Sequence, residues 1–324
     1  MSTTAFDAPL DSSITERLQD GAMVPLPSLG LLQVSGDDAR SFLQAQLTQD
    51  IATATDSRWT LAGYCNPKGR LFGLFTVIQS DAGFLLVTRR ELLENLLKRL
   101  RMFVLRSKVS IEDVSDNYRC LGIVGDGPLQ RLEETAGSTP EGPFSMHQAG
   151  DLLVLNQPGE LPRKLLIAPT EQLEELQQAL QGTVGNAPEQ LWWLTEIRAG
   201  IPAVTEGTRE SFVPQQVNLE LVGGVDFKKG CYPGQEIVAR MHSLGKPSRR
   251  MYRMLAPLAS DVPAPGDKVT DGAGTSGGEV VLAAPGPDGT ELLAVLKTGF
   301  QDRQDLQVAL APAEIAPLPY DLEG

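Results

Sequence analysis

The chain has 324 residues, 41% of them hydrophobic, and a formal net charge of -13. This length exceeds what one ordinary domain holds, so we expect two or three domains, each with enough apolar side chains for a core. The acidic balance disfavours non-specific nucleic-acid binding, and no apolar run approaches the about 18 residues that a membrane span needs.

The start of the chain and the cysteines bear on localisation and chemistry. Residues 1–20 mix Ser, Thr, Asp and Glu with neither a basic start nor an apolar core, which is unlike a signal or transit peptide. We interpret them as a partly ordered arm of a cytoplasmic protein. The three cysteines, Cys65, Cys120 and Cys231, are widely spaced, and only two histidines accompany them. These counts argue against a disulfide framework and against a dedicated metal site.

Residues 1–116 predict one α+β unit. Its expected elements are strands over 29–35, 59–65, 71–79, 84–88 and 108–113 and helices over 39–47 and 90–104. The second helix carries leucines at helical spacing, which indicates packing against a core. Strands and helices in this order are typical of a mainly antiparallel sheet with its helices on one face.

Residues 117–186 predict a second unit of the same class. Its expected elements are strands over 119–124, 151–156 and 164–168 and helices over 128–135 and 170–181. Thr170 is the expected cap of the last helix. We find no internal sequence repeat that links this unit to the first.

Residues 187–249 form the expected third region. The segment 188–197 is helical or extended and carries Trp192 and Trp193. Adjacent residues point in different directions in either state, so one tryptophan can lie in a core while the other lines a pocket. Residues 206–221 then form a long connection without clear periodicity, which is typical of a functional loop or of one that wraps another domain.

Residues 250–324 predict a small barrel or sandwich, because short strand patterns alternate with Gly, Pro and Asp turns. The expected strands cover 250–255, 268–270, 279–283, 292–297 and 306–310. The rigid run 315–320 is expected to dock on a neighbouring surface.

One string, Lys228-Lys229-Gly230-Cys231-Tyr232-Pro233-Gly234-Gln235-Glu236, gathers a thiol, two ammonium groups and turn residues before a short helix expected to begin at Gln235. A helix start and nearby cations both stabilise a thiolate, so Cys231 is a candidate reactive thiol. The alternative is that Cys231 is a small buried packing residue, as many free cysteines are.

Two segments are basic in this acidic chain. Their cations are Arg89, Arg90, Lys98, Arg99, Arg101, Arg106 and Lys108 in the first, and Lys228, Lys229, Arg240, Lys246, Arg249, Arg250 and Arg253 in the second. They favour a local anionic ligand over a surface that coats a polyanion. The alternative is that they are solvated faces.

The cysteine string closely resembles the signature K-G-C-Y-x-G-Q-E of the YgfZ family, folate-binding relatives of the glycine-cleavage T-protein. The matching motif residues are Lys229, Gly230, Cys231, Tyr232, Gly234, Gln235 and Glu236. Shorter pieces that also fit the family are residues 42–50, 66–70, 199–202 and 212–215, Asn218 and residues 317–320. The resemblance therefore runs along most of the chain.

This resemblance implies two ferredoxin-like or T-protein-like α+β lobes and a C-terminal small β-barrel, arranged around a central channel that takes tetrahydrofolate in an unspecified form. The lobes correspond to residues 1–116 and 117–186, the rest of the folate-binding core to 187–249, and the barrel with its docking tail to 250–324. The family supports assembly or repair of iron–sulfur clusters, especially in enzymes that methylthiolate tRNA.

The resemblance also implies roles for single residues. Cys231 matches the functional thiol of the family, and Trp192 matches a tryptophan of its folate pocket. A second pocket tryptophan falls at Leu29, so one stacking surface is missing here. A flat heterocycle with anionic glutamates wants aromatic rings at one end and cations such as Lys229 and Arg249 at the other.

One departure separates the chain from the aminomethyltransferases. Those enzymes carry paired aspartates after a glycine-rich turn, whereas the stretch 69–74 contains no carboxylate. Without it, no group is evident to move a proton at the folate nitrogen. The leading hypothesis is therefore a folate-binding accessory protein whose partners are iron–sulfur enzymes. A folate-dependent aminomethyl transferase is the alternative, and direct tRNA binding through the basic segments is disfavoured.

Overall fold

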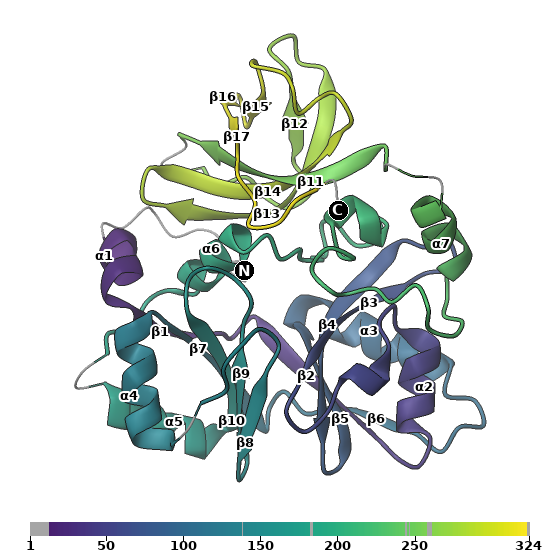
Figure 1. Ribbon diagram of the computed structural model, residues 1–324, viewed down its shortest axis with the longest axis vertical. Coiled ribbons are helices and arrows are strands. Elements are labelled where there is room, and N and C mark those ends of the chain that lie inside the picture. The colour runs from purple at the N-terminus through teal and green to yellow at the C-terminus, as the bar shows by residue number, and fades with distance from the viewer. Residues whose placement is uncertain are drawn as a thin grey trace.

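The computed structural model describes residues 13–137, 139–181, 184–243, 245, 247–257 and 261–322. Two α+β lobes lie side by side, and a third sheet formed by the C-terminal part of the chain lies across their upper end (Figure 1). The expected α+β class is confirmed. Among the described residues, no helix is long and apolar enough to cross a membrane.

The first lobe is a five-stranded antiparallel sheet in the order β3-β4-β5-β2-β6. Its strands are β2 (Leu29–Ser35), β3 (Thr60–Cys65), β4 (Leu71–Ser80), β5 (Gly83–Arg89) and β6 (Ser110–Asp113). Its helices are α2 (Ala39–Gln46), the short 3-10 helix η1 (Ile51–Thr53) and α3 (Arg90–Met102). All seven elements expected for this part of the chain are present, with ends shifted by one or two residues.

The second lobe has the strand order β1-β7-β10-β9-β8. Its strands are β1 (Ala22–Pro25), β7 (Tyr118–Val124), β8 (Met146–Ala149), β9 (Leu152–Asn156) and β10 (Arg163–Pro169). Its helices are α1 (Ser13–Asp20), α4 (Asp126–Ala136) and α5 (Thr170–Leu180). The expected arm thus contains a helix, and the rest of it lies outside the described residues.

Two expectations for this lobe are wrong. Strand β1 pairs with β7, so the stretch assigned to the first lobe contributes an edge strand to the second. Thr170 does not cap α5, because Pro169 occupies the cap position and the Thr170 hydroxyl lies inside the helix without a partner among the described residues.

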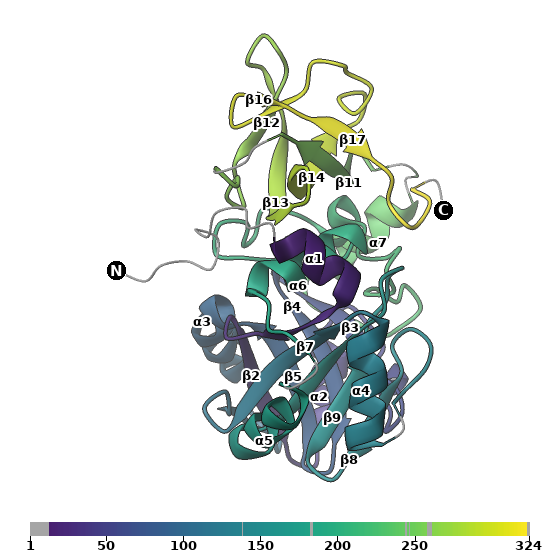
Figure 2. The ribbon, with the colours of Figure 1, turned by 90° about the vertical axis from the view of Figure 1, so that its left-hand side faces the viewer.

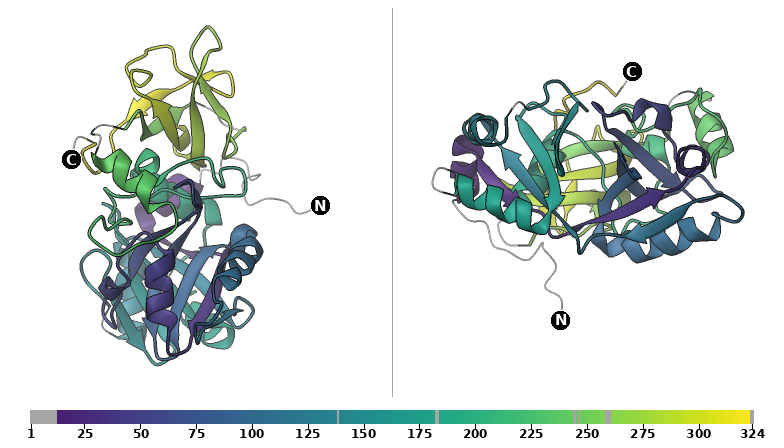
Figure 3. Two further views of the ribbon diagram at one scale, coloured as in Figure 1. Left: turned by 90° about the vertical axis from the view of Figure 1, so that its right-hand side faces the viewer. Right: turned by 90° about the horizontal axis from the view of Figure 1, so that it is seen from below.

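The two lobes share one topology, although their sequences show no repeat. In each, an inner strand next to the sheet edge leads through a helix into a three-stranded meander, and a second helix follows: β2-α2-β3-β4-β5-α3 and β7-α4-β8-β9-β10-α5. They differ in the fifth strand, which is β6 after the last helix in the first lobe and β1 before β7 in the second. The view from below shows the lobes as neighbours (Figure 3).

The second sheet is buried on both faces. Leu121 and Ile123 of β7 belong to the core beneath α4 and α5, whereas Cys120 and Val124 belong to the large central core shared with the first lobe and α6 (Glu189–Arg198). Because both faces exclude water, these strands are near-continuous apolar runs rather than alternating ones. The centre of the molecule is therefore enclosed by both lobes.

The long connection after α6 joins the lobes to the C-terminal sheet. It contains the 3-10 helix η2 (Pro214–Val217) and leads to α7 (Gln235–Ser243). The amide of Leu71 donates to the carbonyl of Phe212 at 2.8 Å, and the Asn218 side chain donates to the carbonyl of Met251 at 2.8 Å. The connection therefore contacts both the first lobe and the C-terminal sheet, which favours the second of the two interpretations of its length.

The C-terminal sheet has the order β16-β15-β12-β13-β14-β11-β17 and lies above the lobes, with α1 and α6 at the level between them (Figure 2). Its strands are β11 (Arg249–Ala256), β12 (Lys268–Thr270), β13 (Ser276–Gly286), β14 (Gly289–Lys297), β15 (Gln307–Val308), β16 (Ala311–Pro312) and β17 (Glu314–Ala316). The sheet curls but its edge strands β16 and β17 do not pair, so it is a half-barrel and not the expected closed barrel.

The tail docks as expected. The Tyr320 hydroxyl donates to the carbonyl of Gly200 at 2.7 Å and accepts from the Asn218 side chain at 3.4 Å. A methyl group at Gly200 would lie 2.6 Å from the Tyr320 ring, so this contact requires glycine. Three separate pieces of the family resemblance thus meet at one point.

Candidate functional site

A small central cavity lies where the two lobes, α6 and the C-terminal sheet meet. Its volume is about 100 Å³. The first lobe contributes walls from β2 to β5, β10 and α6 contribute further walls, and Leu282 of β13 also lines it. Leu29 and Trp192, far apart in sequence, both line it, so the structure brings these two expected site residues together.

Both tryptophans of α6 line the cavity and both are buried, with exposed fractions of 2% for Trp192 and 5% for Trp193. The expectation that one lies in a core and the other in a pocket is too simple, because α6 is buried on nearly all sides. Trp192 lies against Gly122, where a methyl group would approach its ring to 2.4 Å. The indole of Trp193 lies under the guanidinium of Arg89, 3.5 Å from the ring centroid.

Two arginines supply the charge around the cavity. Burial lowers the pKa of Arg89 to about 10, against the opposing influence of Glu91, Glu189 and Glu196. The second, Arg163, is 1% exposed and pairs with Glu196 at 2.7 Å. Glu196 itself lines the cavity, and this ion pair with Arg163 neutralises its carboxylate.

Two buried polar atoms of cavity-lining residues, Arg89 Nη2 and Trp193 Nε1, have no hydrogen-bond partner among the described residues. Buried polar groups in native proteins are nearly always paired, and each unpaired one costs about 1–3 kcal/mol. Both are obligate donors. The cavity is therefore suited to a ligand that carries acceptor atoms.

The cysteine motif lies on the first lobe and not at the cavity. The Lys229 ammonium donates to the carbonyls of Gln44, at 2.6 Å, and Leu47 at the end of α2. Burial lowers the pKa of Lys229 to about 8, with Asp50 and Asp226 acting in the opposite direction. The ammonium satisfies carbonyls that the helix end leaves open. The Lys229 ammonium is therefore already hydrogen-bonded to main-chain carbonyls within the protein.

Close glycine contacts fix the motif to the hairpin turn at 66–69. Gly234 has a φ of +80°, and a methyl group there would lie 2.4 Å from the Asn66 carbonyl oxygen and 2.6 Å from Gly69. Further along, the Gln215 side chain donates to the carbonyl of Val238 at 2.6 Å. One contact network thus joins the cysteine motif to helix α2, the hairpin turn at 66–69 and the η2 segment.

Cys231 is exposed, whereas Cys65 and Cys120 are buried and their thiols have pKa values raised to about 12, chiefly by burial. The packing interpretation therefore fits Cys65 and Cys120 and is wrong for Cys231. A methyl group on the preceding residue, Gly230, would meet nothing within 4 Å. Of the three thiols, Cys231 is the one that another molecule can reach.

The other motif residues surround this exposed tip. Tyr232 is buried, and burial with a smaller effect of Cys65 raises its pKa. The Gln235 side chain donates weakly to the carbonyl of Lys229, at 3.5 Å, and Glu236 is exposed. Both begin α7, which lies at one edge of the molecule, whereas α6 lies at its centre (Figure 1).

The expected cations do not gather at the cavity. Arg249 lies at the start of β11, opposite Lys297, and Lys246 lies outside the described residues. Among the described residues, the cation that lines the cavity is Arg89, which the sequence placed in a basic segment without a role. Glu196 was also missed. Two sequence signals could have pointed to these residues. Arg89 is a charged residue at the end of a buried strand, and Glu196 lies one helical turn after Trp192.

Comparisons with known proteins agree with this architecture. Residues 16–148 match the GCVT N-terminal domain family. The chain is 32% identical to the tRNA-modifying protein YgfZ of Klebsiella pneumoniae over 313 residues, covering 93% of each protein. It is 34% identical to the protein of the same name from Photorhabdus laumondii over 248 residues, covering 76% of the chain and 74% of the relative.

Among solved structures, the glycine cleavage system aminomethyltransferase T from Bartonella henselae superposes with a TM-score of 0.79. The match covers 99% of the chain and 94% of that protein at 16% sequence identity. At this identity the likeness establishes the fold, which is that of the T-protein.

Proposed function

The chain belongs to the YgfZ family, and on this premise we propose that it is a tetrahydrofolate-binding accessory protein for iron–sulfur enzymes. Its contribution is to support cluster assembly or repair, and thereby tRNA modification by methylthiolation, in the cytoplasm. The central cavity takes the folate heterocycle, and Cys231 is the functional thiol. The observation that carries the proposal is the pair of unpartnered donors, Arg89 Nη2 and Trp193 Nε1, on residues that line that cavity.

The cavity residues fit a folate heterocycle in chemistry. Arg89 Nη2 and Trp193 Nε1 offer donors to ring acceptors, and the Glu196 carboxylate can accept from ring N–H groups. Leu61 and Leu74 supply apolar walls. The volume of about 100 Å³ lies below the roughly 300–1,000 Å³ of typical ligand pockets, so the cavity has to widen when the heterocycle enters.

Stacking on the tryptophans is restricted. Arg89 covers one face of Trp193, and Gly122 and Arg163 lie against Trp192. We therefore expect the heterocycle to bind through the edge of Trp193, unless Arg89 moves aside.

The alternative function, folate-dependent aminomethyl transfer, is less well supported. The only acid among the described residues that line the cavity is Glu196, which is paired with Arg163 at 2.7 Å. A paired carboxylate is a poor base for the folate nitrogen. Folate-dependent release of a one-carbon unit by the purified protein would favour the alternative; we expect none.

The separation of the thiol from the cavity favours work on a partner protein. Cys231 is exposed and does not line the cavity. A thiol presented at the surface can accept or donate a group to a partner, whereas one beside the folate would share its chemistry. The expected partners are radical-type tRNA methylthiotransferases, and a direct tRNA complex is not expected at physiological salt.

The folate half of the proposal is tested by fluorescence titration. Tetrahydrofolate is expected to quench the emission of Trp192 and Trp193, and Trp193→Phe, which loses the unpartnered Nε1, should weaken binding about three- to tenfold. Trp59→Phe is the matched control, because Trp59 Nε1 already donates to the carbonyl of Asn156 at 3.1 Å. Absence of saturable binding at millimolar tetrahydrofolate would refute the folate function.

The thiol half is tested in a strain that lacks its own YgfZ. Cys231→Ala should fold normally but fail to restore methylthiolated tRNA, measured by mass spectrometry of nucleosides. Cys120→Ala, which also removes one thiol, is the control and should restore it, since Cys120 is a buried side chain. Full restoration by Cys231→Ala would rule out a role for that thiol.

A further inference from the structure

The C-terminal end of α3 carries three exposed apolar side chains. Met102 is 64% exposed, Phe103 37% and Leu105 85%. Single exposed apolar residues are normal on a protein surface, whereas several that lie together mark a site of interaction. These three lie within four consecutive positions, and we call them the α3 tip.

The backbone of the α3 tip is strained. Leu105 has a φ of +45°, in the left-handed region that costs an L-residue about 1–2 kcal/mol. Glycine or asparagine is the ordinary residue at such a position. The chain therefore accepts an unfavourable conformation and an exposed leucine at the same residue. Strained residues of this kind gather at functional and binding sites.

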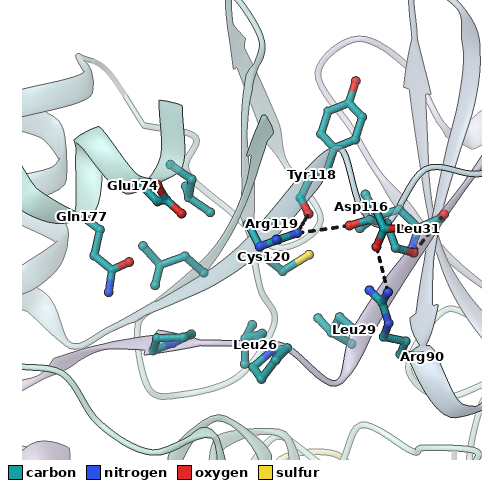
Figure 4. A pocket seen from close by; sticks show the side chains of 15 residues that line it. Leu26, Leu29, Leu31, Arg90, Asp116, Tyr118, Arg119, Cys120, Glu174 and Gln177 are labelled. Carbon is teal, nitrogen blue, oxygen red and sulfur yellow. Dashed lines mark hydrogen bonds and ion pairs between the residues drawn. The ribbon is translucent and has the colours of Figure 1, made fainter. Parts of the chain in front are cut away.

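Cations without acidic partners flank the α3 tip. Arg101 donates from Nε to the carbonyl of Ile111 at 2.9 Å, which holds its guanidinium at the surface. In the part of the chain that the structure describes, neither Arg101 nor Arg106 pairs with a carboxylate. The start of the same helix differs, because Arg90 pairs there with Asp116 at 3.0 Å (Figure 4). The α3 tip thus combines apolar area with free positive charge in a protein whose net charge is -13.

The α3 tip is attached to the strand that holds the cysteine motif. The guanidinium carbon of Arg99 lies 5.9 Å from the ring centroid of Phe103 and 5.8 Å from that of Tyr64. Tyr64 of β3 forms a backbone bridge with Leu47, whose carbonyl accepts from the Lys229 ammonium. The chain between α3 and β6 also lies on the same side of the molecule as α7 (Figures 1 and 3). The α3 tip and the cysteine motif therefore share one side of the first lobe.

We propose that the α3 tip is the docking surface for the iron–sulfur enzyme that Cys231 serves, and that it binds an acidic segment of that enzyme with apolar side chains. The apolar side chains of the tip supply contact area, and Arg101 and Arg106 select a segment rich in Asp and Glu. Nucleic acid is disfavoured as the occupant, because bases stack on aromatic or guanidinium planes and Met102 and Leu105 offer neither. This inference rests on the proposed function and adds the surface that recognises the partner.

The test measures the binding of a purified radical-type tRNA methylthiotransferase from the same organism by biolayer interferometry. Leu105→Asn should weaken binding at least about tenfold, as expected for a central apolar contact. Because asparagine tolerates the left-handed region, the melting temperature of this variant should not fall. Arg106→Gln should slow association about two- to fivefold at low salt. It should have no effect at about 1 M salt, where charges are screened within about 3 Å.

Leu310→Asn is the matched control. Leu310 is 90% exposed with a φ of +66°, and it lies between β15 and β16 in the C-terminal sheet. Its replacement should leave the affinity unchanged.

Equal affinity of wild type and Leu105→Asn would overturn the inference and leave the role of Cys231 to its own complementation test. A larger effect of Arg106→Gln than of Leu105→Asn, together with a tRNA gel shift at physiological salt, would also overturn it, in favour of a nucleic-acid contact. Failure of wild type to bind the methylthiotransferase would overturn both the inference and the proposed partner.

Discussion

Replacement of Gly234 by alanine should detach the cysteine motif from the first lobe. Gly234 has a φ of +80°, and an L-residue in this region costs about 1–2 kcal/mol. The added methyl group would also lie 2.4 Å from the Asn66 carbonyl oxygen and 2.6 Å from backbone atoms of Gly69. These neighbours are backbone, so they move only with the whole hairpin turn, at a further cost of about 1–3 kcal/mol.

The total of roughly 2–5 kcal/mol predicts a measurable change. In a protein of this size about 1 kcal/mol shifts the melting temperature by roughly 2 °C, so Gly234→Ala should melt roughly 4–10 °C lower. Cys231 should also react faster with a thiol reagent such as DTNB, because the loop that carries it is no longer anchored. Differential scanning calorimetry and reagent kinetics measure the two effects.

The control lies in the same motif. Gly230→Ala adds a methyl group that would meet nothing within 4 Å, so its melting temperature should stay within about 1 °C of wild type. Equal melting temperatures of Gly234→Ala and Gly230→Ala would refute the close-contact argument and leave the motif glycines without a distinct structural role.

Three further predictions concern single contacts. Arg163→Met leaves the Glu196 carboxylate, 13% exposed, without its partner and should lower the free energy of unfolding by about 3–5 kcal/mol in urea titrations. Because the folded pKa of Lys229 is about 8, below its ordinary 10.5, its buried charge is unfavourable below pH 8. Wild type should therefore gain about 3 kcal/mol relative to Lys229→Met between pH 8 and 10.5, and a flat difference would contradict the shift. Tyr320→Phe loses the 2.7 Å bond to Gly200 and should cost about 1 kcal/mol, measured by the same titration.

The local elements could be predicted because their sequence patterns are strong. The leucine stripe of α3 and the apolar runs of β4 and β10 fix element type without tertiary information. Strands β1 and β8 were missed, since each has four residues and depends on a neighbour for pairing. Sequence could not show that the C-terminal sheet stays open, because closure depends on whether its two edge strands meet.

The site was only partly predictable for a related reason. Motif resemblance led to Trp192, Leu29 and Cys231, and the first two do share a cavity. Lys229 looked like a ligand partner because a free ammonium and one that caps a helix have the same sequence signal. Arg89 could be recognised as a cavity residue only once β5 and α6 were placed against each other.

The pairing of β1 with β7 also sets an order of events in the making of the protein. Ala22 lies opposite Val124, so the first strand of the second lobe leaves the ribosome about one hundred residues before its partner. At about 5–20 residues per second, this strand waits roughly 5–20 s while the whole first lobe is synthesised. The second lobe can complete its sheet only when β7 pairs with β1, a segment that was synthesised before the whole first lobe. We therefore expect the first lobe to fold first during translation, with the N-terminal strand as the last piece of the second lobe to be secured.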